Sequence, residues 1–132
     1  MTLSPDQRDA LVDAARAARA RSHSPYSGFA VGAALLCADG EVVTAANVEN
    51  ASYGLTLCAE RAAVVRALAE GRREFVAVAV ATGAPAPVLP CGACRQVMAE
   101  FAPELTVLAV GEGAEVAEAS LATLLPGRFE GP

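Results

Sequence analysis

Three cysteines and one glutamate form the clearest chemical pattern in the sequence. Cys91 and Cys94 are spaced three residues apart directly after Pro90. This spacing on a helix brings both sulfurs to one face, where they can bind one zinc ion. If a helix that starts near Cys58 meets the same sheet edge, three thiolates converge and the fourth tetrahedral position is left for water. Three protein ligands are typical of catalytic zinc, whereas structural zinc is normally closed by four.

Glu60 follows Cys58 by two residues, which constrains where the cysteine lies. In a regular helix, residue i+2 lies about 200° around the axis, so the two side chains could not face one site from mid-helix. Cys58 is therefore expected at the helix cap, where the helix N-terminus also favours its thiolate form. From there Glu60 approaches the water on zinc and serves as the proton shuttle. Arg61, three residues after Cys58, is expected to hydrogen-bond the sulfurs.

A series of helices and strands must position these residues. Ser4, Pro5 and Gln7 predict a capped helix start. Asp39 and Gly40 predict a hairpin turn. The expected elements are a helix at 5–20, strands at 29–37 and 41–45, a loop at 47–56, a helix at 57–70, a strand at 75–81, a helix at 91–101, strands at 105–110 and 115–119, and a helical turn at 121–125. Two strand-helix-strand crossovers after a hairpin predict an α/β fold, a three-layer α/β/α sandwich with a mixed, about five-stranded sheet.

Composition limits the classes of protein to consider. The 132 residues, 54% hydrophobic and 19% charged, predict a single folded domain over 1–132. The net charge of -5 argues against nucleic acid as a partner. Three prolines and two glycines interrupt the uncharged run at 75–94, so no membrane span is expected there. The start lacks a secretory signal, so a cytoplasmic location is expected, where four cysteines favour metal or buried thiols over disulfides.

The chain resembles the small homotetrameric zinc-dependent cytidine deaminases along nearly its whole length. The cysteine and glutamate pattern is that of the zinc deaminases. Five blocks in the right order carry the resemblance, at residues 25–34, 47–54, 58–61, 90–96 and 124–129. The resemblance implies the cytidine deaminase fold, Zn²⁺ bound by Cys58, Cys91 and Cys94, and Glu60 moving protons from water to the cytosine N3 and the departing ammonia.

The resemblance also implies a substrate site shared between subunits of a homotetramer. The residues it implies are Phe29 as an aromatic wall near the base, the Ala59 backbone N–H as a base contact, Asn47 and Glu49 as partners of the ribose 3′-hydroxyl, Tyr53 reaching the 5′-hydroxyl from another subunit, and Phe129 stacking on the base in a neighbouring subunit. A carboxylate suits a sugar hydroxyl and not a phosphate, which favours a free nucleoside. The implied reaction is hydrolytic deamination of cytidine and 2′-deoxycytidine to uridine and 2′-deoxyuridine plus ammonia, by zinc-bound hydroxide attack at C4.

Other interpretations remain open at this point. A blasticidin-type nucleoside-antibiotic deaminase shares the cysteine blocks, but the Asn47 and Glu49 block and Phe129 favour plain ribose. A non-catalytic zinc-stabilised interaction module requires a closed site, with Cys37 as fourth ligand; Cys37 is better explained as a buried thiol in an apolar strand. An enzyme that edits nucleic acids is disfavoured by the net negative charge of the chain. His23, the only histidine, is expected to have a structural role.

Overall fold

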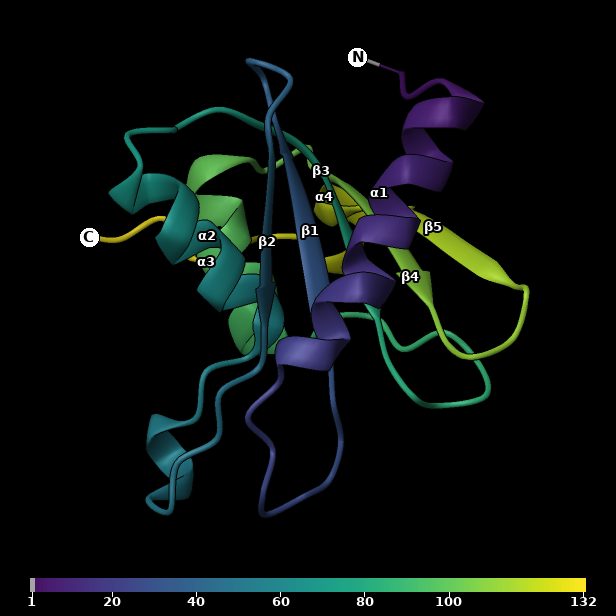
Figure 1. Cartoon of the computed structure of the whole chain (residues 1–132). Helices are drawn as coiled ribbons and strands as arrows, with labels where there is room; N and C mark the ends of the chain where they lie inside the picture. Colours follow the sequence, from purple (N-terminus) through teal and green to yellow (C-terminus); the bar gives the residue numbers. More distant parts are fainter. Residues whose placement is uncertain (1) are drawn as a thin grey trace.

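Five strands form one mixed sheet in the order β2-β1-β3-β4-β5 (Figure 1). The structure, a computed structural model, describes residues 2–132. The strands are β1 (Gly32–Cys37), β2 (Val42–Ala46), β3 (Phe75–Ala81), β4 (Thr106–Val110) and β5 (Val116–Ser120). β1 pairs antiparallel with β2 and β3, β3 pairs parallel with β4, and β4 pairs antiparallel with β5. The predicted mixed five-stranded sheet is confirmed.

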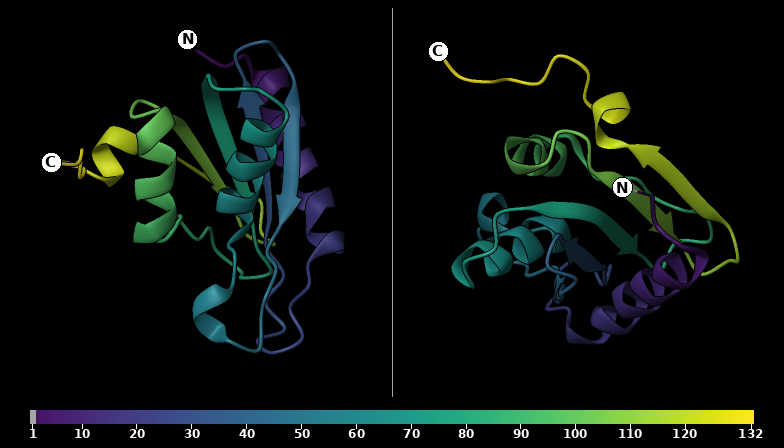
Figure 2. Two further views of the ribbon diagram at one scale, coloured as in Figure 1. Left: turned by 90° about the vertical axis from the view of Figure 1, so that its left-hand side faces the viewer. Right: turned by 90° about the horizontal axis from the view of Figure 1, so that it is seen from above.

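Helices cover both faces of this sheet. They are α1 (Pro5–Ala18), α2 (Ala59–Ala69), α3 (Gly92–Phe101) and α4 (Leu121–Leu124), with 3₁₀ turns at Arg19–Arg21 and Tyr53–Leu55. α1 lies on one face, and α2 and α3 lie together on the other (Figure 2). This arrangement confirms the predicted three-layer α/β/α sandwich. Across residues 2–132, we find no helix with the length and apolar character needed to cross a bilayer.

The sheet separates two hydrophobic cores. Val78 and Val80 of β3 point toward α2 and α3, whereas the alternate alanines Ala77, Ala79 and Ala81 point toward α1. Both faces of the inner strands are covered, which explains why their sequences are continuously apolar instead of alternating with polar residues. The alanines leave space for the α1 backbone to lie close to the sheet.

The start of α1 and the hairpin turn lie where the local sequence motifs predicted them, whereas the ends of some other elements differ from the prediction. The predicted capping box at Ser4 and Gln7 is present. Gly40 has φ +89° and ends the hairpin turn, while Asp39 keeps a negative φ, so only the glycine needs the left-handed conformation. The predicted strand 29–37 begins only at Gly32, because the backbone of Phe29–Val31 bonds outside the sheet.

Gly32 lies where α1 touches β1, and replacing it with alanine is expected to destabilise the fold. A Cβ there would lie 2.1 Å from the carbonyl oxygen of Ala15 and 2.7 Å from the backbone nitrogen of Arg19. Both atoms belong to helical backbone and cannot move alone, so we expect Gly32→Ala to lower the free energy of unfolding by about 3 kcal/mol or more. Urea unfolding measures this change. Gly54→Ala is the control, since a Cβ at Gly54 meets nothing within 4 Å; equal losses for both variants would contradict the packing argument.

Candidate active site

Three cysteine sulfurs meet where α2 and α3 begin. Cys58 is the N-cap of α2 and Cys91 is the N-cap of α3, while Cys94 is buried in the first turn of α3. Their Sγ atoms all lie within 4.8 Å of one another. Tetrahedral geometry with bonds of 2.3 Å separates sulfur ligands by about 3.8 Å, so the cluster fits one zinc ion. The expectation that Cys58 lies at a helix cap is confirmed.

Hydrogen bonds inside the cluster favour the ionised form of Cys58 and the protonated form of Cys94. The hydrogen bond with Cys94 and that from Arg61 lower the pKa of Cys58 to about 5, against the opposing effect of burial. The same bond with Cys58, together with burial, raises the pKa of Cys94. The sulfurs thus share protons in a compact group, and a metal ion that binds here displaces those protons.

Glu60 lies beside the sulfur cluster and is buried, with 5% of its surface exposed. Burial raises the pKa of its carboxyl group above the ordinary value. The residue lines a cavity of about 260 Å³ together with Cys58, Cys91 and the buried Ala59. Glu60 therefore faces the same space as the sulfurs and is not turned outward to solvent.

Phe29 and Asn47 form another part of the cavity wall. The Asn47 side chain donates to the Phe29 carbonyl at 2.9 Å and accepts from the Val31 N–H at 3.0 Å. It also accepts from the Ser22 hydroxyl at 2.5 Å. Asn47 is thus a framework residue that fixes the Phe29 segment at the cavity, a role that its sequence context did not predict.

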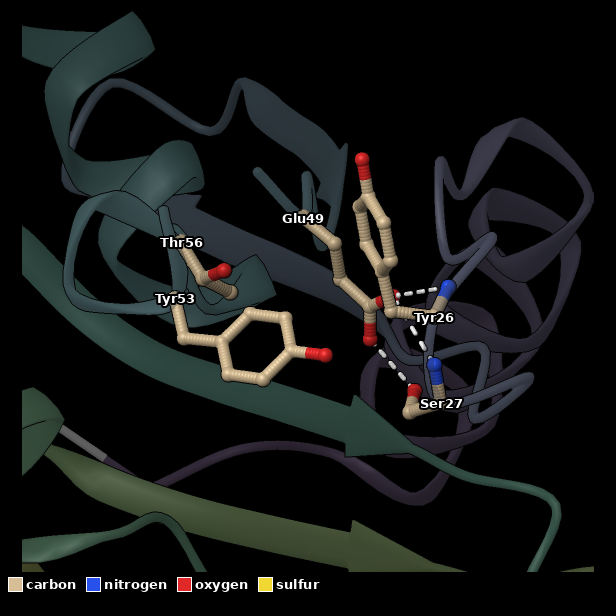
Figure 3. A pocket seen from close by; sticks show the side chains of 5 residues that line it. All are labelled: Tyr26, Ser27, Glu49, Tyr53 and Thr56. Atoms are coloured by element: carbon tan, nitrogen blue, oxygen red, sulfur yellow. Dashed lines mark hydrogen bonds between the residues drawn. The ribbon is translucent and has the colours of Figure 1, made fainter. Parts of the chain in front are cut away.

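Glu49 and Tyr53 lie in a neighbouring pocket of about 350 Å³, which shares Thr56 with the cavity (Figure 3). The Glu49 carboxylate accepts from the Tyr26 N–H at 2.9 Å, the Ser27 N–H at 3.1 Å and the Ser27 hydroxyl. These bonds, the hydroxyl bond foremost, lower the pKa of Glu49. Tyr53 is 73% exposed, with its ring edge-on to that of Tyr26. The predicted sugar-reading pair Asn47 and Glu49 thus faces two adjoining spaces.

Phe129 lies apart from this chain's own cavity. Its side chain is 72% exposed, and its backbone pairs with the Gln96 side chain of α3. Cys37 is also remote, because it ends β1 at the hairpin, bonded to Gly40 and Glu41. Five residues of strand, about 17 Å, separate it from the β1 end near the cavity. Cys37 is therefore not the fourth ligand of a closed zinc site.

Comparison with known proteins identifies the family. Residues 5–110 match the family model described as the cytidine and deoxycytidylate deaminase zinc-binding region. The chain belongs to the cytidine deaminase family. The cytidine deaminase of Halalkalibacterium halodurans is 52% identical over 123 residues, which cover 92% of this chain and 93% of that protein. The crystal structure of cytidine deaminase from Burkholderia pseudomallei superimposes with a TM-score of 0.90 at 49% identity, covering 98% of this chain and 100% of that one.

Membership of the cytidine deaminase family bears on the earlier alternatives. Blasticidin-S deaminase of Bacillus cereus is 30% identical over 108 residues, 75% of this chain and 76% of that protein. The cytidine deaminases of Halalkalibacterium halodurans and Sporosarcina psychrophila are more similar, at 52% and 44% identity, and cover more of this chain, at 92% and 90%, which favours the main interpretation. The zinc-binding region of the family contains all three clustered cysteines, so Zn²⁺ is the cofactor.

Other residues that line the cavity were not predicted from the sequence. Thr82, Val88 and Leu89 line the cavity beside the cysteines. Thr82 is a buried polar residue directly after β3, and the carboxyl ends of parallel strands commonly form ligand sites. The position of Thr82 directly after a buried strand was therefore the sequence feature that could have indicated a site residue. Val88 and Leu89 precede Pro90, and no feature of their types distinguishes them from ordinary loop residues.

Arg61 contacts the sulfur cluster, and its removal is expected to weaken zinc binding. Its Nη2 atom lies 3.4 Å from the Cys58 Sγ atom and 3.3 Å from the Thr56 carbonyl oxygen. Partners of metal ligands typically account for about 10- to 100-fold in metal affinity, so we expect a loss of that size for Arg61→Ala. Competition with a chromophoric chelator measures it. Arg66→Ala, on an exposed part of the same helix, is the control, and unchanged zinc affinity for Arg61→Ala would reject this role.

Proposed function

We propose that this chain catalyses the hydrolytic deamination of free cytidine and 2′-deoxycytidine, giving uridine and 2′-deoxyuridine plus ammonia. The observation that carries the proposal is the buried Glu60 carboxyl group beside three converging sulfurs, at one end of a largely apolar cavity. In this reaction a C–O bond forms at C4 of the pyrimidine ring and the C4–N bond to the amino group breaks. The family assignment supports this chemistry.

The residues of the cluster divide the work between binding metal and moving protons. Cys58, Cys91 and Cys94 hold zinc, which when bound supplies a Lewis acid that lowers the pKa of a water ligand toward about 7. Glu60 accepts a proton from the attacking water and delivers it to N3 of the base. It then takes the remaining proton from the hydroxyl group formed at C4 and delivers it to the amino group, which leaves as ammonia while C4 becomes a carbonyl carbon. The burial of Glu60 keeps bulk water away from these transfers.

The cavity walls position the nucleoside. Phe29 packs beside the base, and the Ala59 N–H donates to it, since both residues line the cavity. The ribose 3′-hydroxyl bonds to Asn47 and Glu49. Glu49 is held by three hydrogen bonds and carries negative charge, which disfavours a phosphate on the sugar and so selects nucleosides.

The protein acts as a homotetramer of single-domain chains that span residues 1–132. The exposed rings of Tyr53 and Phe129 support this assembly, because 73% and 72% of their surfaces lie open in one chain. In the tetramer Tyr53 reaches the 5′-hydroxyl and Phe129 stacks on the base of a neighbouring subunit. None of the four cysteines is paired in a disulfide, which supports a cytoplasmic location.

The decrease in cytidine absorbance with purified protein tests this function directly. We expect turnover of cytidine and 2′-deoxycytidine, its loss after zinc is removed with a chelator, and its return when zinc is added back. Blasticidin S is assayed beside them by ammonia release. Turnover of the antibiotic alone would favour the antibiotic deaminase, and zinc-loaded protein that turns over none of the three would favour a non-catalytic module.

A further inference from the structure

The last residue of α4 and the chain after it are attached to α3 by several side chains. This segment, residues 125–132, lies beside α3 on the side away from α2 (Figure 2). Arg95 Nη1 donates to the Leu124 carbonyl at 2.9 Å, while its Nε donates to the Pro90 carbonyl at 2.7 Å. Arg128 Nη1 donates to the Ala99 carbonyl at 2.5 Å. The segment and the loop before Cys91 are therefore fixed to the same helix.

Gln96 makes the contact closest to the end of this segment. Its Nε2 donates to the Phe129 carbonyl at 2.9 Å, and its Oε1 accepts from the Phe129 N–H at 3.3 Å. The amide side chain thus pairs with both polar groups of one residue, as a neighbouring strand would. Two bonds in fixed geometry define the direction of the Phe129 backbone as well as its position.

Most of the Phe129 side chain is left unburied in this chain. It is 72% exposed, and it does not line the cavity of its own chain. A large apolar side chain that is fixed at its backbone and open to solvent is arranged for contact with another molecule. Ordering it beforehand lowers the entropy cost of that contact.

We propose that Gln96 is a positioning residue for substrate binding, which acts by fixing Phe129 in the orientation needed to enter the neighbouring subunit's site. This inference rests on the proposed function, in which Phe129 stacks on the base. Gln96 touches neither the substrate nor the zinc ligands, so its removal affects KM more than kcat. Its effect also disappears when Phe129 has no ring to position.

Gln96→Met tests the proposal, because methionine keeps the length of the side chain and loses both hydrogen bonds. We expect KM for cytidine to rise about 5- to 10-fold, the size typical for loss of one or two such bonds. We expect kcat, zinc content and thermal stability to stay near those of the unchanged protein. Gln96→Ala is a second variant with the same expected result. Gln7→Ala is the matched control, since it removes the other glutamine amide, which bonds Ser4 at 2.9 Å in the α1 cap.

A double-mutant cycle with Phe129→Ala separates positioning from a general structural role. If Gln96 acts through Phe129, the double variant has the KM of Phe129→Ala alone. Multiplicative effects of the two changes would overturn the proposal, as would an unchanged KM for both Gln96 variants. If Phe129→Ala itself leaves KM unchanged, the stacking role fails and this inference fails with it, while measured cytidine turnover still supports the deaminase function.

Discussion

Glu60→Gln is expected to reduce kcat for cytidine by about 10²- to 10⁴-fold while the protein keeps its zinc and its fold. The amide has nearly the size of the carboxyl group, so it fits the buried position beside Cys58. An amide cannot accept the proton of the attacking water and cannot carry it to N3 or to the leaving amino group. Both transfers depend on one side chain, which is why the expected loss is large. Steady-state absorbance assays and metal analysis of the same sample measure the two quantities.

Glu70→Gln is the matched control for this change. Glu70 is the C-cap of the same helix, at the opposite end from Cys58, and it forms ion pairs with Arg66 and Arg72. We expect its removal to leave kcat within about twofold, as is usual for exposed ion pairs. If Glu60→Gln kept kcat within tenfold with zinc bound, another group would have to move the protons.

The sulfur and carboxyl positions could be predicted from the sequence because they depend on local geometry. The spacing of Cys58 and Glu60 is incompatible with a shared face in mid-helix, and this constraint places the cysteine at a cap without knowledge of the tertiary structure. Cys91 and Cys94 depend on local geometry in another way, because residues three apart share one helix face, and both lie at the start of α3. The position of Cys37 in an apolar strand likewise predicts burial, and its structure at the hairpin agrees.

Contacts between distant segments could not be predicted in this way. The side chain of Asn47 bonds to residues 16 and 18 positions earlier in the chain, and Gln96 bonds to one 33 positions later. Neither pairing follows from helical or strand spacing. Phe29 to Val31 have a strand-like apolar composition, yet Asn47 binds their backbone and holds them out of the sheet to form the cavity wall. Composition alone does not distinguish these two outcomes.

Cys91→Ser is expected to lose zinc, and activity with it. Cys91 supplies one of three sulfurs, and its hydroxyl replacement is a far weaker ligand for zinc. Zinc binding at sites with four ligands contributes about 10–16 kcal/mol, or about 2.5–4 kcal/mol for each ligand, which corresponds to a loss of about 100- to 1,000-fold in affinity. Chelator competition measures the affinity, and metal analysis after dialysis measures what remains bound.

Cys37→Ser is the matched control because it makes the same chemical change outside the cluster. Burial raises the pKa of the Cys37 thiol, and its side chain packs in the core, so the hydroxyl lowers the free energy of unfolding without touching zinc. The two variants therefore differ in what they lose. Cys37→Ser loses stability and keeps zinc, whereas Cys91→Ser, at an exposed position, loses zinc. Because zinc binds only the folded chain, chelation should lower the Tm of the unchanged protein and of Cys37→Ser, but leave that of Cys91→Ser where it is. Zinc retained at full affinity by Cys91→Ser would remove this residue from the ligand set.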